Sequence, residues 1–256
     1  MTDINPSLEE ELAAKIVRAC VAYDRGKPIM SDELFDDLVN KLHSVNPNNK
    51  IFGKPFGGEH LLSLDNTRFT EWYRGKRKNT PLVIEPKIDG VALGISYQNG
   101  KLFRAYTRSG RDVTRYAKKV ADIPWEVPRS GRFIVRGELY AYNECTPSSQ
   151  RLAAAQLRKI NPDCHLLSFI AFEIINSQND HLDNLKTLVD YSFNVTPYKI
   201  AHTADEVIKY HNDWLDGWFM NYLPTDGIVA KVNSRKIQKE LGQSNKCPLW
   251  ALALKR

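Results

Sequence analysis

The first apolar residues of the chain recur every three or four positions, which is the spacing of an amphipathic helix. They are Leu8, Leu12, Ile16, Val17, Cys20 and Val21. Ser7 and Glu10 have the spacing of a capping box, so we expect this helix to begin at Ser7. It should end near Asp24, because Gly26 and Pro28 follow.

A second helix is predicted from Ser31 or Asp32, because apolar residues recur at helical spacing after this point. Its expected buried residues are Leu34, Leu38, Val39 and Leu42. A loop rich in glycine and proline follows, from Pro47 to Gly58. We interpret residues 1–57 as a small helical module and this loop as its boundary with a larger domain, residues 58–256.

After this loop, the apolar residues occur in short runs with the period of β-strands. Asn99 and Gly100 separate two such runs and predict a type I′ hairpin. Further strands are expected at residues 82–85, 132–142, 166–175, 226–233 and 250–255, and helices at residues 149–160 and 203–215. Antiparallel strands with segregated helices are typical of the α+β class, so we predict an α+β fold.

Composition and charge narrow the class of protein further. No apolar run reaches the ~18 residues of a membrane span, and the polar N-terminus does not resemble a signal peptide, so we expect a cytoplasmic globular protein. A net charge of +6 fits a partner rich in phosphate. Cys20, Cys145, Cys164 and Cys247 lack zinc-ligand spacing, so no zinc site is expected.

The segment EPKIDG, residues 85–90, is the first candidate for chemistry. A lysine becomes a nucleophile only after it loses its proton, so its surroundings must disfavour the charged form. Lys87 follows a predicted buried strand, and Gly90 would allow a ligand to approach the backbone closely. By itself, the pattern K-x-D-G equally fits a surface lysine before a turn.

More segments with chemical potential follow in a fixed order. They are FIVRGE with Glu138, FIAFEI with Phe172, DGIVAK with Asp226 and Lys231, and WALALK with Lys255. Each has a simpler interpretation, because charged residues often end strands in water and Phe172 could be a core aromatic. Their joint occurrence in one order is much less expected by chance than any one of them.

Together these segments resemble the motifs of the covalent nucleotidyltransferases, which include ligases and capping enzymes. In detail they resemble the bacterial NAD+-dependent DNA ligases, across essentially the whole chain. The resemblance implies an antiparallel-sheet nucleotidyltransferase domain of the ATP-grasp-like ligase type. It also implies that Lys87 attacks the α-phosphate of NAD+, forms lysyl-AMP and releases nicotinamide mononucleotide (NMN). The AMP would later pass to a 5′-phosphate at a nick in double-stranded DNA.

The resemblance further implies a role for each matching charged residue. Lys231 and Lys255 should contact the α-phosphate and disfavour the protonated form of the nucleophile. Asp89, in the K-x-D-G motif, should belong to the same catalytic group. Glu138 should hold the ribose and, together with Asp226, help to place Mg2+, which prefers oxygen ligands.

Other matching residues are expected to contact the AMP part of NAD+. The adenine pocket should be lined by Glu85 and by the segment Ser63, Leu64 and Asp65. Phe172 should stack on the adenine ring. Arg108 and Arg158 should contact ribose or phosphate.

In the N-terminal module, Tyr23, Asp32, Phe35 and Asp36 match the family's NMN site. Asp32 and Asp36 are four residues apart on one helix face, and an aromatic ring with two carboxylates suits a cationic nicotinamide ring and a ribose. The alternative is that the aspartates only favour the start of a helix. Ala22 and Phe35 replace the tyrosines usual in the family, which indicates a divergent member, such as a viral or phage protein.

Two other functions remain open. The first is an ATP-dependent ligase or a capping-type nucleotidyltransferase, which would not need the NMN site. The second is a non-catalytic basic subunit that clamps DNA, although the presence of Lys87 and Lys255 argues against it. The family's oligonucleotide-binding (OB), zinc-finger, helix–hairpin–helix and BRCT domains have no counterpart in this sequence. We therefore expect either a separate C-terminal ligase subunit as a partner or an excised fragment.

Overall fold

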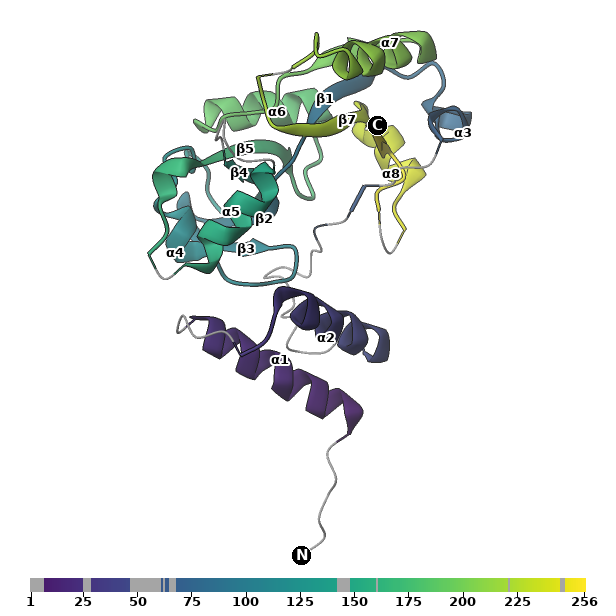
Figure 1. The fold of residues 1–256 in the computed structure, drawn as a ribbon. Coiled ribbons are helices and arrows are strands. Elements are labelled where there is room, and N and C mark those ends of the chain that lie inside the picture. Colours follow the sequence, from purple (N-terminus) through teal and green to yellow (C-terminus); the bar gives the residue numbers. More distant parts are fainter. Residues whose placement is uncertain are drawn as a thin grey trace, which may run out of the picture.

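The computed structural model describes residues 7–24, 29–46, 61, 63–64, 68–141, 148–159, 161–220, 222–244 and 247–256. Two helices are followed by two four-stranded antiparallel sheets that carry the remaining helices (Figure 1). The predicted α+β class is therefore confirmed. The predicted boundary near residue 57 lies outside the described residues. In the described part of the chain, no helix is long and apolar enough to cross a bilayer.

The N-terminal helices are α1 (Leu8–Asp24) and α2 (Asp32–Val45), as the apolar spacing predicts. They pack on each other through Leu12, Ile16 and Leu42. The side chain of Ser31 caps α2 by accepting a hydrogen bond from the backbone N–H of Leu34. Leu34 itself is 51% exposed, so the prediction that it is buried is wrong. Leu34 lies in the first turn of α2 and is not part of the cluster that joins the two helices, whereas Leu38 and Leu42, one and two turns later, belong to it.

One sheet consists of the strands that surround the predicted hairpin. In spatial order they are β3 (Lys101–Thr107), β2 (Val91–Gln98), β4 (Arg132–Ala141) and β5 (Leu167–Ile174). The turn between β2 and β3 has φ values of 49° at Asn99 and 80° at Gly100. A type I′ turn needs positive φ at both central residues, so the predicted hairpin is confirmed.

The other sheet carries the candidate nucleophile. In spatial order its strands are β6 (Lys199–Ala201), β1 (Leu82–Ile88), β7 (Thr225–Val232) and β8 (Ala251–Lys255). Strand β1 is longer than predicted, so Lys87 lies inside it and pairs with Gly227 instead of following the strand. Pro86 is tolerated because β6 pairs only with Leu82–Ile84, which leaves one edge of β1 open beyond that point.

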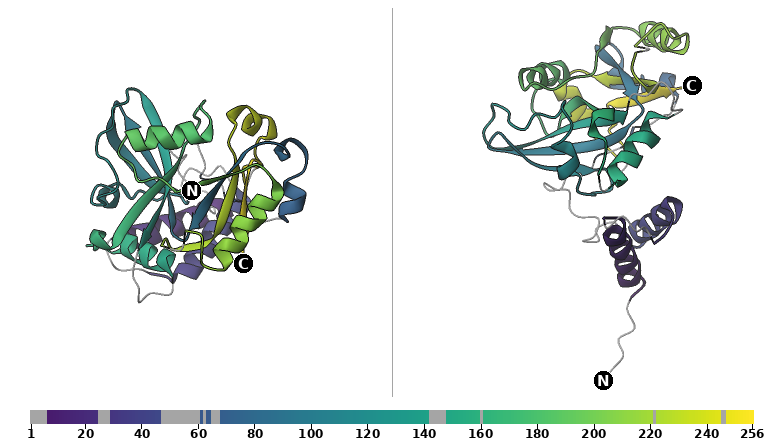
Figure 2. Two further views of the ribbon diagram at one scale, coloured as in Figure 1. Left: turned by 90° about the horizontal axis from the view of Figure 1, so that it is seen from above. Right: turned by 60° about the vertical axis from the view of Figure 1, so that its left-hand side comes forward.

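Helices cover one face of each sheet, as the two lobes of Figure 2 show. The first sheet packs against α4 (Thr114–Ala117), α5 (Ser149–Arg158) and α6 (His181–Asp190), and the second against α3 (Phe69–Trp72), α7 (Ala204–Leu215) and α8 (Arg235–Leu241). Two short 3-10 helices, η2 (Gly75–Arg77) and η3 (Cys164–Leu166), complete these lobes. The capping box of Thr203 and Glu206 at α7 is present as predicted, whereas α6 and α8 were not predicted.

Alternation along the strands separates core residues from candidate functional residues. In β1, Leu82 and Ile84 enter the core under α7, whereas Glu85 and Lys87 line a cavity on the other face. In β4, Val135 and Leu139 enter the core under α5, whereas Arg136 and Glu138 line the same cavity. Since successive strand side chains point to opposite faces, each sheet presents one charged face to the space between the sheets.

Candidate functional site

A cavity of about 290 Å³ lies between the uncovered faces of the two sheets. Most of its lining comes from strands β1, β4, β5, β7 and β8. The lining residues are Ser63, Leu64, Glu85, Pro86, Lys87, Ile88, Arg108, Arg136, Glu138, Phe172, Glu173, Thr196, Val229, Lys231, Pro248, Trp250, Ala251, Ala253 and Lys255. The mixture of cationic, anionic and aromatic side chains suits a ligand that carries both a phosphate and a flat ring.

The Asp226 carboxylate joins the ammonium groups of Lys87 and Lys255. The Nζ of Lys87 lies 2.7 Å from Oδ1 of Asp226, and the Nζ of Lys255 lies 2.8 Å from Oδ2. Burial alone would raise the pKa of Asp226, but the hydrogen bonds from Lys255 and Lys87 outweigh it and lower this pKa. Two ammonium groups and one carboxylate leave net positive charge at this end of the cavity, where an anionic group would be attracted.

A β-bulge is the reason that Asp226 can reach Lys87. By strict alternation Asp226 would share the core-facing side of β7 with Ile228 and Ala230. However, Lys87 pairs with Gly227 and Ile88 pairs with Thr225, so the register shifts at Asp226. Bulges re-aim side chains in this way, and here the bulge turns a carboxylate from the core toward Lys87.

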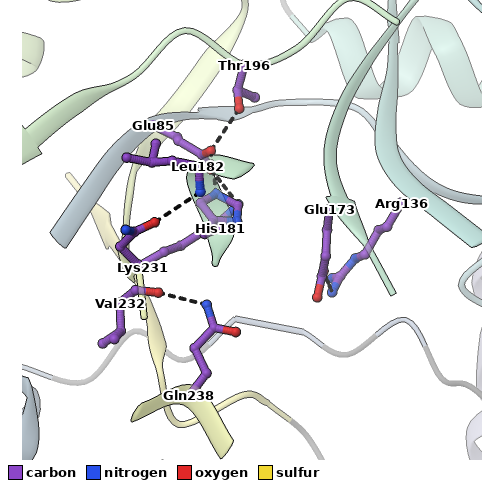
Figure 3. A network of polar contacts seen from close by, with 10 residues as sticks. Glu85, Arg136, Glu173, His181, Leu182, Thr196, Lys231, Val232 and Gln238 are labelled. Atoms are coloured by element: carbon purple, nitrogen blue, oxygen red, sulfur yellow. Dashed lines mark hydrogen bonds and ion pairs between the residues drawn. The ribbon is translucent and has the colours of Figure 1, made fainter. Parts of the chain in front are cut away.

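Glu85 is the centre of a second, buried polar network (Figure 3). Only 1% of Glu85 is exposed, and its carboxylate pairs with the ammonium group of Lys231. His181 Nε2 lies 2.8 Å from Oε1 of Glu85, and the hydroxyl of Thr196 donates to the same oxygen at 3.0 Å. Burial alone would raise the pKa of Glu85, but Lys231 and His181 lower it to about 2. The carboxylate is therefore charged and held by donors from three other segments.

The Phe172 ring lies beside two cationic side chains at the cavity wall. Lys231 Nζ is 4.8 Å from the ring centroid, and the guanidinium of Arg136 is 5.6 Å from it. Arg136 also donates to Glu173 at 3.2 Å (Figure 3). These contacts place the aromatic ring in the cavity lining and not in the core, as predicted for a stacking residue.

Glu138 lies in the same cavity among charged neighbours. Burial raises the pKa of Glu138 to about 7, although Arg108, Arg136 and Lys87 oppose the rise. Burial likewise lowers the pKa of Arg108, which donates a hydrogen bond to Ser63 at 3.1 Å. Burial thus deprives both residues of favourable hydration, and a bound polar partner would compensate for this loss.

The structure brings together most of the residues proposed from the sequence. Those that line the cavity are Ser63, Leu64, Glu85, Lys87, Arg108, Glu138, Phe172, Lys231 and Lys255. Asp226 joins them through its two lysine partners. Asp65 and the side chains of Tyr23, Asp32, Phe35 and Asp36 lie outside the described residues.

Two expectations need correction, and a third stays a prediction. Arg158 ends α5 and is not among the residues that line the cavity, and its expected contact with ribose or phosphate stays a prediction. Gly90 allows close approach of β4 and not of a ligand, because a Cβ there would lie 2.4 Å from the carbonyl oxygen of Leu139. Lys231 was expected at a phosphate, yet it pairs with Glu85.

Asp89 does not line the cavity. Its carboxylate accepts a hydrogen bond from the hydroxyl of Ser148 at 3.4 Å. Sequence reasoning missed His181, Thr196 and Arg136. Arg136 could have been found from its position two residues before Glu138 in a predicted strand. No local signal marks His181 or Thr196, because their contacts to Glu85 span 96 and 111 residues of sequence.

The comparison with protein families gives a match over residues 52–256, to the model for the NAD-dependent DNA ligase adenylation domain. Curated relatives called DNA ligase include one from Cytophaga hutchinsonii, 34% identical over 91% of this chain and 43% of its own length. Another, from Fervidobacterium nodosum, is 31% identical over 91% of this chain and 42% of its own length. The chain thus spans less than half the length of these relatives.

Solved structures resemble this chain in fold. An archaeal ATP-dependent RNA ligase has a TM-score of 0.50 and 15% identity, over 77% of this chain and 48% of its own. A protein from Aquifex aeolicus, assigned as an ATP-dependent DNA ligase, has a TM-score of 0.50 and 15% identity, over 77% of this chain and 49% of its own. At this level of identity the likeness concerns the fold alone, and it agrees with the predicted nucleotidyltransferase architecture.

The raised pKa of Glu138 gives a prediction about stability. The folded protein keeps a proton on Glu138 up to about pH 7, whereas the unfolded chain loses it near pH 4.5. The unfolding free energy of the protein without nucleotide or metal should therefore fall as pH rises from about 4.5 to about 7. In wild type we expect this fall to be about 1–2 kcal/mol, a figure that allows for the partial exposure of the Glu138 side chain. Glu138→Gln should not show it.

Urea unfolding at several pH values measures this difference between wild type and Glu138→Gln. Glu126→Gln, at an exposed ion pair with Lys101, is the matched control and should follow the wild-type pH dependence. A Glu138→Gln protein with the same pH dependence as wild type would contradict the raised pKa.

Proposed function

This chain belongs to the adenylation-domain family of the NAD-dependent DNA ligases, and we propose that its Lys87 takes up AMP from NAD+. The observation that carries the proposal is the Lys87–Asp226–Lys255 arrangement beside a cavity with an aromatic wall. A nucleophilic amine, a second cation for the phosphate and a site for a flat base are the components that this reaction needs.

In the proposed reaction, Nζ of Lys87 forms a bond to the α-phosphorus of NAD+. The bond from that phosphorus to the bridging oxygen breaks, and NMN leaves with the electron pair. Lys87 must first give up a proton, which passes to solvent, because the lowered pKa of Asp226 makes its carboxylate a weak base. Lys255, which pairs with the same Asp226 carboxylate and lines the cavity, is proposed to contact the phosphate as negative charge shifts to the leaving group.

The adenosine part is proposed to occupy the cavity between the sheets. Phe172 offers its ring for stacking on adenine, and Ser63 and Leu64 close the same pocket. Glu138 and Arg108 are proposed to contact the ribose or phosphate, since both are poorly hydrated there. We assign Lys231 to the base-binding end, because its ammonium group pairs with Glu85.

Mg2+ is proposed to assist at the phosphate end. No group of three or more His, Cys, Asp or Glu that could hold a metal is present among the described residues. This still fits Mg2+, which binds through one or two carboxylates together with substrate phosphates and waters. Glu138 is the first candidate, with Asp226 as the second, and bound Mg2+ would neutralise charge on the transferring phosphate.

The N-terminal module is proposed to bind the NMN half of NAD+. Asp32 and Asp36 lie four residues apart in α2, and Tyr23 lies near the C-terminal end of α1. Residues on one helix face can act together, and two carboxylates with an aromatic ring suit a cationic nicotinamide riboside. Phe35 is proposed to add apolar contact at this site.

The AMP acceptor is proposed to be the 5′-phosphate at a nick in double-stranded DNA. The net charge of +6 favours contact with a phosphate backbone, and this contact should weaken as salt increases. Because the chain spans less than half of its curated relatives, sealing is proposed to require the remaining ligase domains as a partner. These would hold the two DNA ends within near-attack distance.

The rival function is nucleotidyl transfer from ATP or GTP. The proteins of similar fold include ATP-dependent ligases, but the family match is to the NAD-dependent adenylation domain. Incubation with NAD+, ATP and GTP, each labelled in the nucleotide, separates these possibilities. We expect protein-bound label from NAD+; label from ATP or GTP instead would support the rival.

Our first functional prediction concerns the nucleophile. Lys87→Ala should abolish the AMP adduct that wild type forms with NAD+ and Mg2+, because the variant lacks the amine that is proposed to attack. Intact mass spectrometry measures the adduct, and Lys101→Ala is the control because Lys101 is exposed and pairs with Glu126 at the surface. An adduct that persists on Lys87→Ala, at wild-type extent, would remove Lys87 from this role.

A second prediction separates the NMN site from the later chemistry. Asp36→Ala should slow adduct formation from NAD+ by at least about tenfold, because the leaving group loses a charged contact. Transfer of AMP from the preformed adduct should change little, since NMN has already left. Asp37→Ala is the matched control, because Asp37 is an exposed neighbour on α2. If Asp36→Ala slowed both steps equally, the NMN assignment would be wrong.

A further inference from the structure

His181 lies behind Glu85 and outside the cavity lining. Its ring is 3% exposed, and its Nε2 is 2.8 Å from Oε1 of Glu85. Glu85, in contrast, does line the cavity. His181 can therefore influence a bound ligand only through Glu85.

The position of His181 is fixed by the start of α6. Its backbone N–H donates to the carbonyl of Asn233 at 2.9 Å, and the next N–H, of Leu182, donates to the Asn233 side chain at 3.0 Å. On the other side of this junction, the carboxylate of Asp180 accepts from the backbone N–H of Arg235 at 2.8 Å. These bonds hold the N-terminus of α6 against the end of β7, so the imidazole cannot shift away from Glu85 as a loop residue could.

The donors around Glu85 are distributed unequally over its two carboxylate oxygens. His181 and Thr196 both bond to Oε1, whereas Lys231 pairs with Oε2. A carboxylate has about four acceptor positions, two on each oxygen. The described residues thus fill Oε1 and leave one position on Oε2, in a side chain that borders the cavity.

We propose that His181 is a positioning and specificity-determining residue, which fixes Glu85 as an acceptor toward the cavity and thereby selects an aminopurine over an oxopurine. An amino group on the base edge can donate to the remaining position on Oε2. A carbonyl oxygen at the same place would meet a negative oxygen without a hydrogen between them. This inference rests on the proposed function, because it assigns the cavity to the base of the dinucleotide.

The His181 contact matters because it opposes protonation of Glu85. A protonated carboxyl group can donate a hydrogen bond and would then accept a carbonyl-bearing base. Burial favours the protonated form, whereas Lys231 and His181 keep the pKa of Glu85 low. Loss of the His181 donor would also leave Thr196 as the remaining described donor to Oε1, so the carboxylate could rotate more readily about its soft terminal torsion.

The test compares NAD+ with nicotinamide hypoxanthine dinucleotide, in which a carbonyl replaces the amino group of adenine. Adduct formation at Lys87 is followed by intact mass for wild type, His181→Gln, His181→Asn and His181→Leu. Wild type should prefer NAD+, and His181→Gln should retain the preference because its amide can donate at similar reach. Leucine cannot donate a hydrogen bond, and asparagine is too short to reach Glu85. His181→Leu and His181→Asn should therefore each lower the ratio of kcat/KM for NAD+ to kcat/KM for the hypoxanthine dinucleotide by at least about tenfold.

Binding of AMP and IMP to the same proteins, measured by calorimetry, separates the two proposals from each other. Absence of any adduct on wild type would overturn the proposed reaction, whereas a preference for AMP that falls in His181→Leu would still support the inference. A ratio unchanged from wild type in both His181→Leu and His181→Asn would overturn it. If His181→Leu does not fold, the comparison of His181→Gln with His181→Asn decides whether the base preference depends on His181, since these variants differ only in the reach of the amide.

Discussion

The Asp226 carboxylate, held between the ammonium groups of Lys87 and Lys255, is the interaction on which the site depends. It exists because a bulge in β7 turns Asp226 out of the core register and toward β1. Lys87 on β1 and Lys255 on β8, which flank β7, would repel each other without a shared anion. The carboxylate therefore allows both cations to stay at one end of the cavity, and a phosphate that arrives there meets charge that is already oriented. Such prior orientation is the main way in which proteins assist phosphoryl transfer.

The opposite end of the cavity follows a different physical rule. Glu85 and Lys231 are almost fully buried, and burying an ion pair costs free energy unless additional hydrogen bonds satisfy it. His181 and Thr196 provide these bonds from α6 and from the segment before β6. The network thus links β1, α6, the segment before β6 and β7, and it fixes the Glu85 carboxylate at the border of the cavity. We therefore propose that separate polar groups within one cavity attract the phosphate and select the base.

The sequence predicted the parts of this fold whose signals are local. Strand periodicity located Glu138 and Lys231, the Asn99-Gly100 turn fixed a hairpin, and capping residues marked α2 and α7. The ordered motifs also identified Lys87, Asp226 and Lys255 before their contacts were known. The misses have physical causes. The bulge at Asp226 is a property of strand pairing, and the contacts of His181 join residues 96 positions apart. Arg158 was assigned from the resemblance, and its contact with ribose or phosphate stays a prediction.

The central claim is that Lys87, and no other lysine of the cavity, carries AMP after reaction with NAD+. Peptide mapping by tandem mass spectrometry, after incubation of the wild-type chain with NAD+ and Mg2+, tests it most directly. We expect one AMP group, bound through nitrogen to Lys87, with release of an equal amount of NMN. AMP on Lys231 or Lys255 instead, or modification without release of NMN, would contradict it.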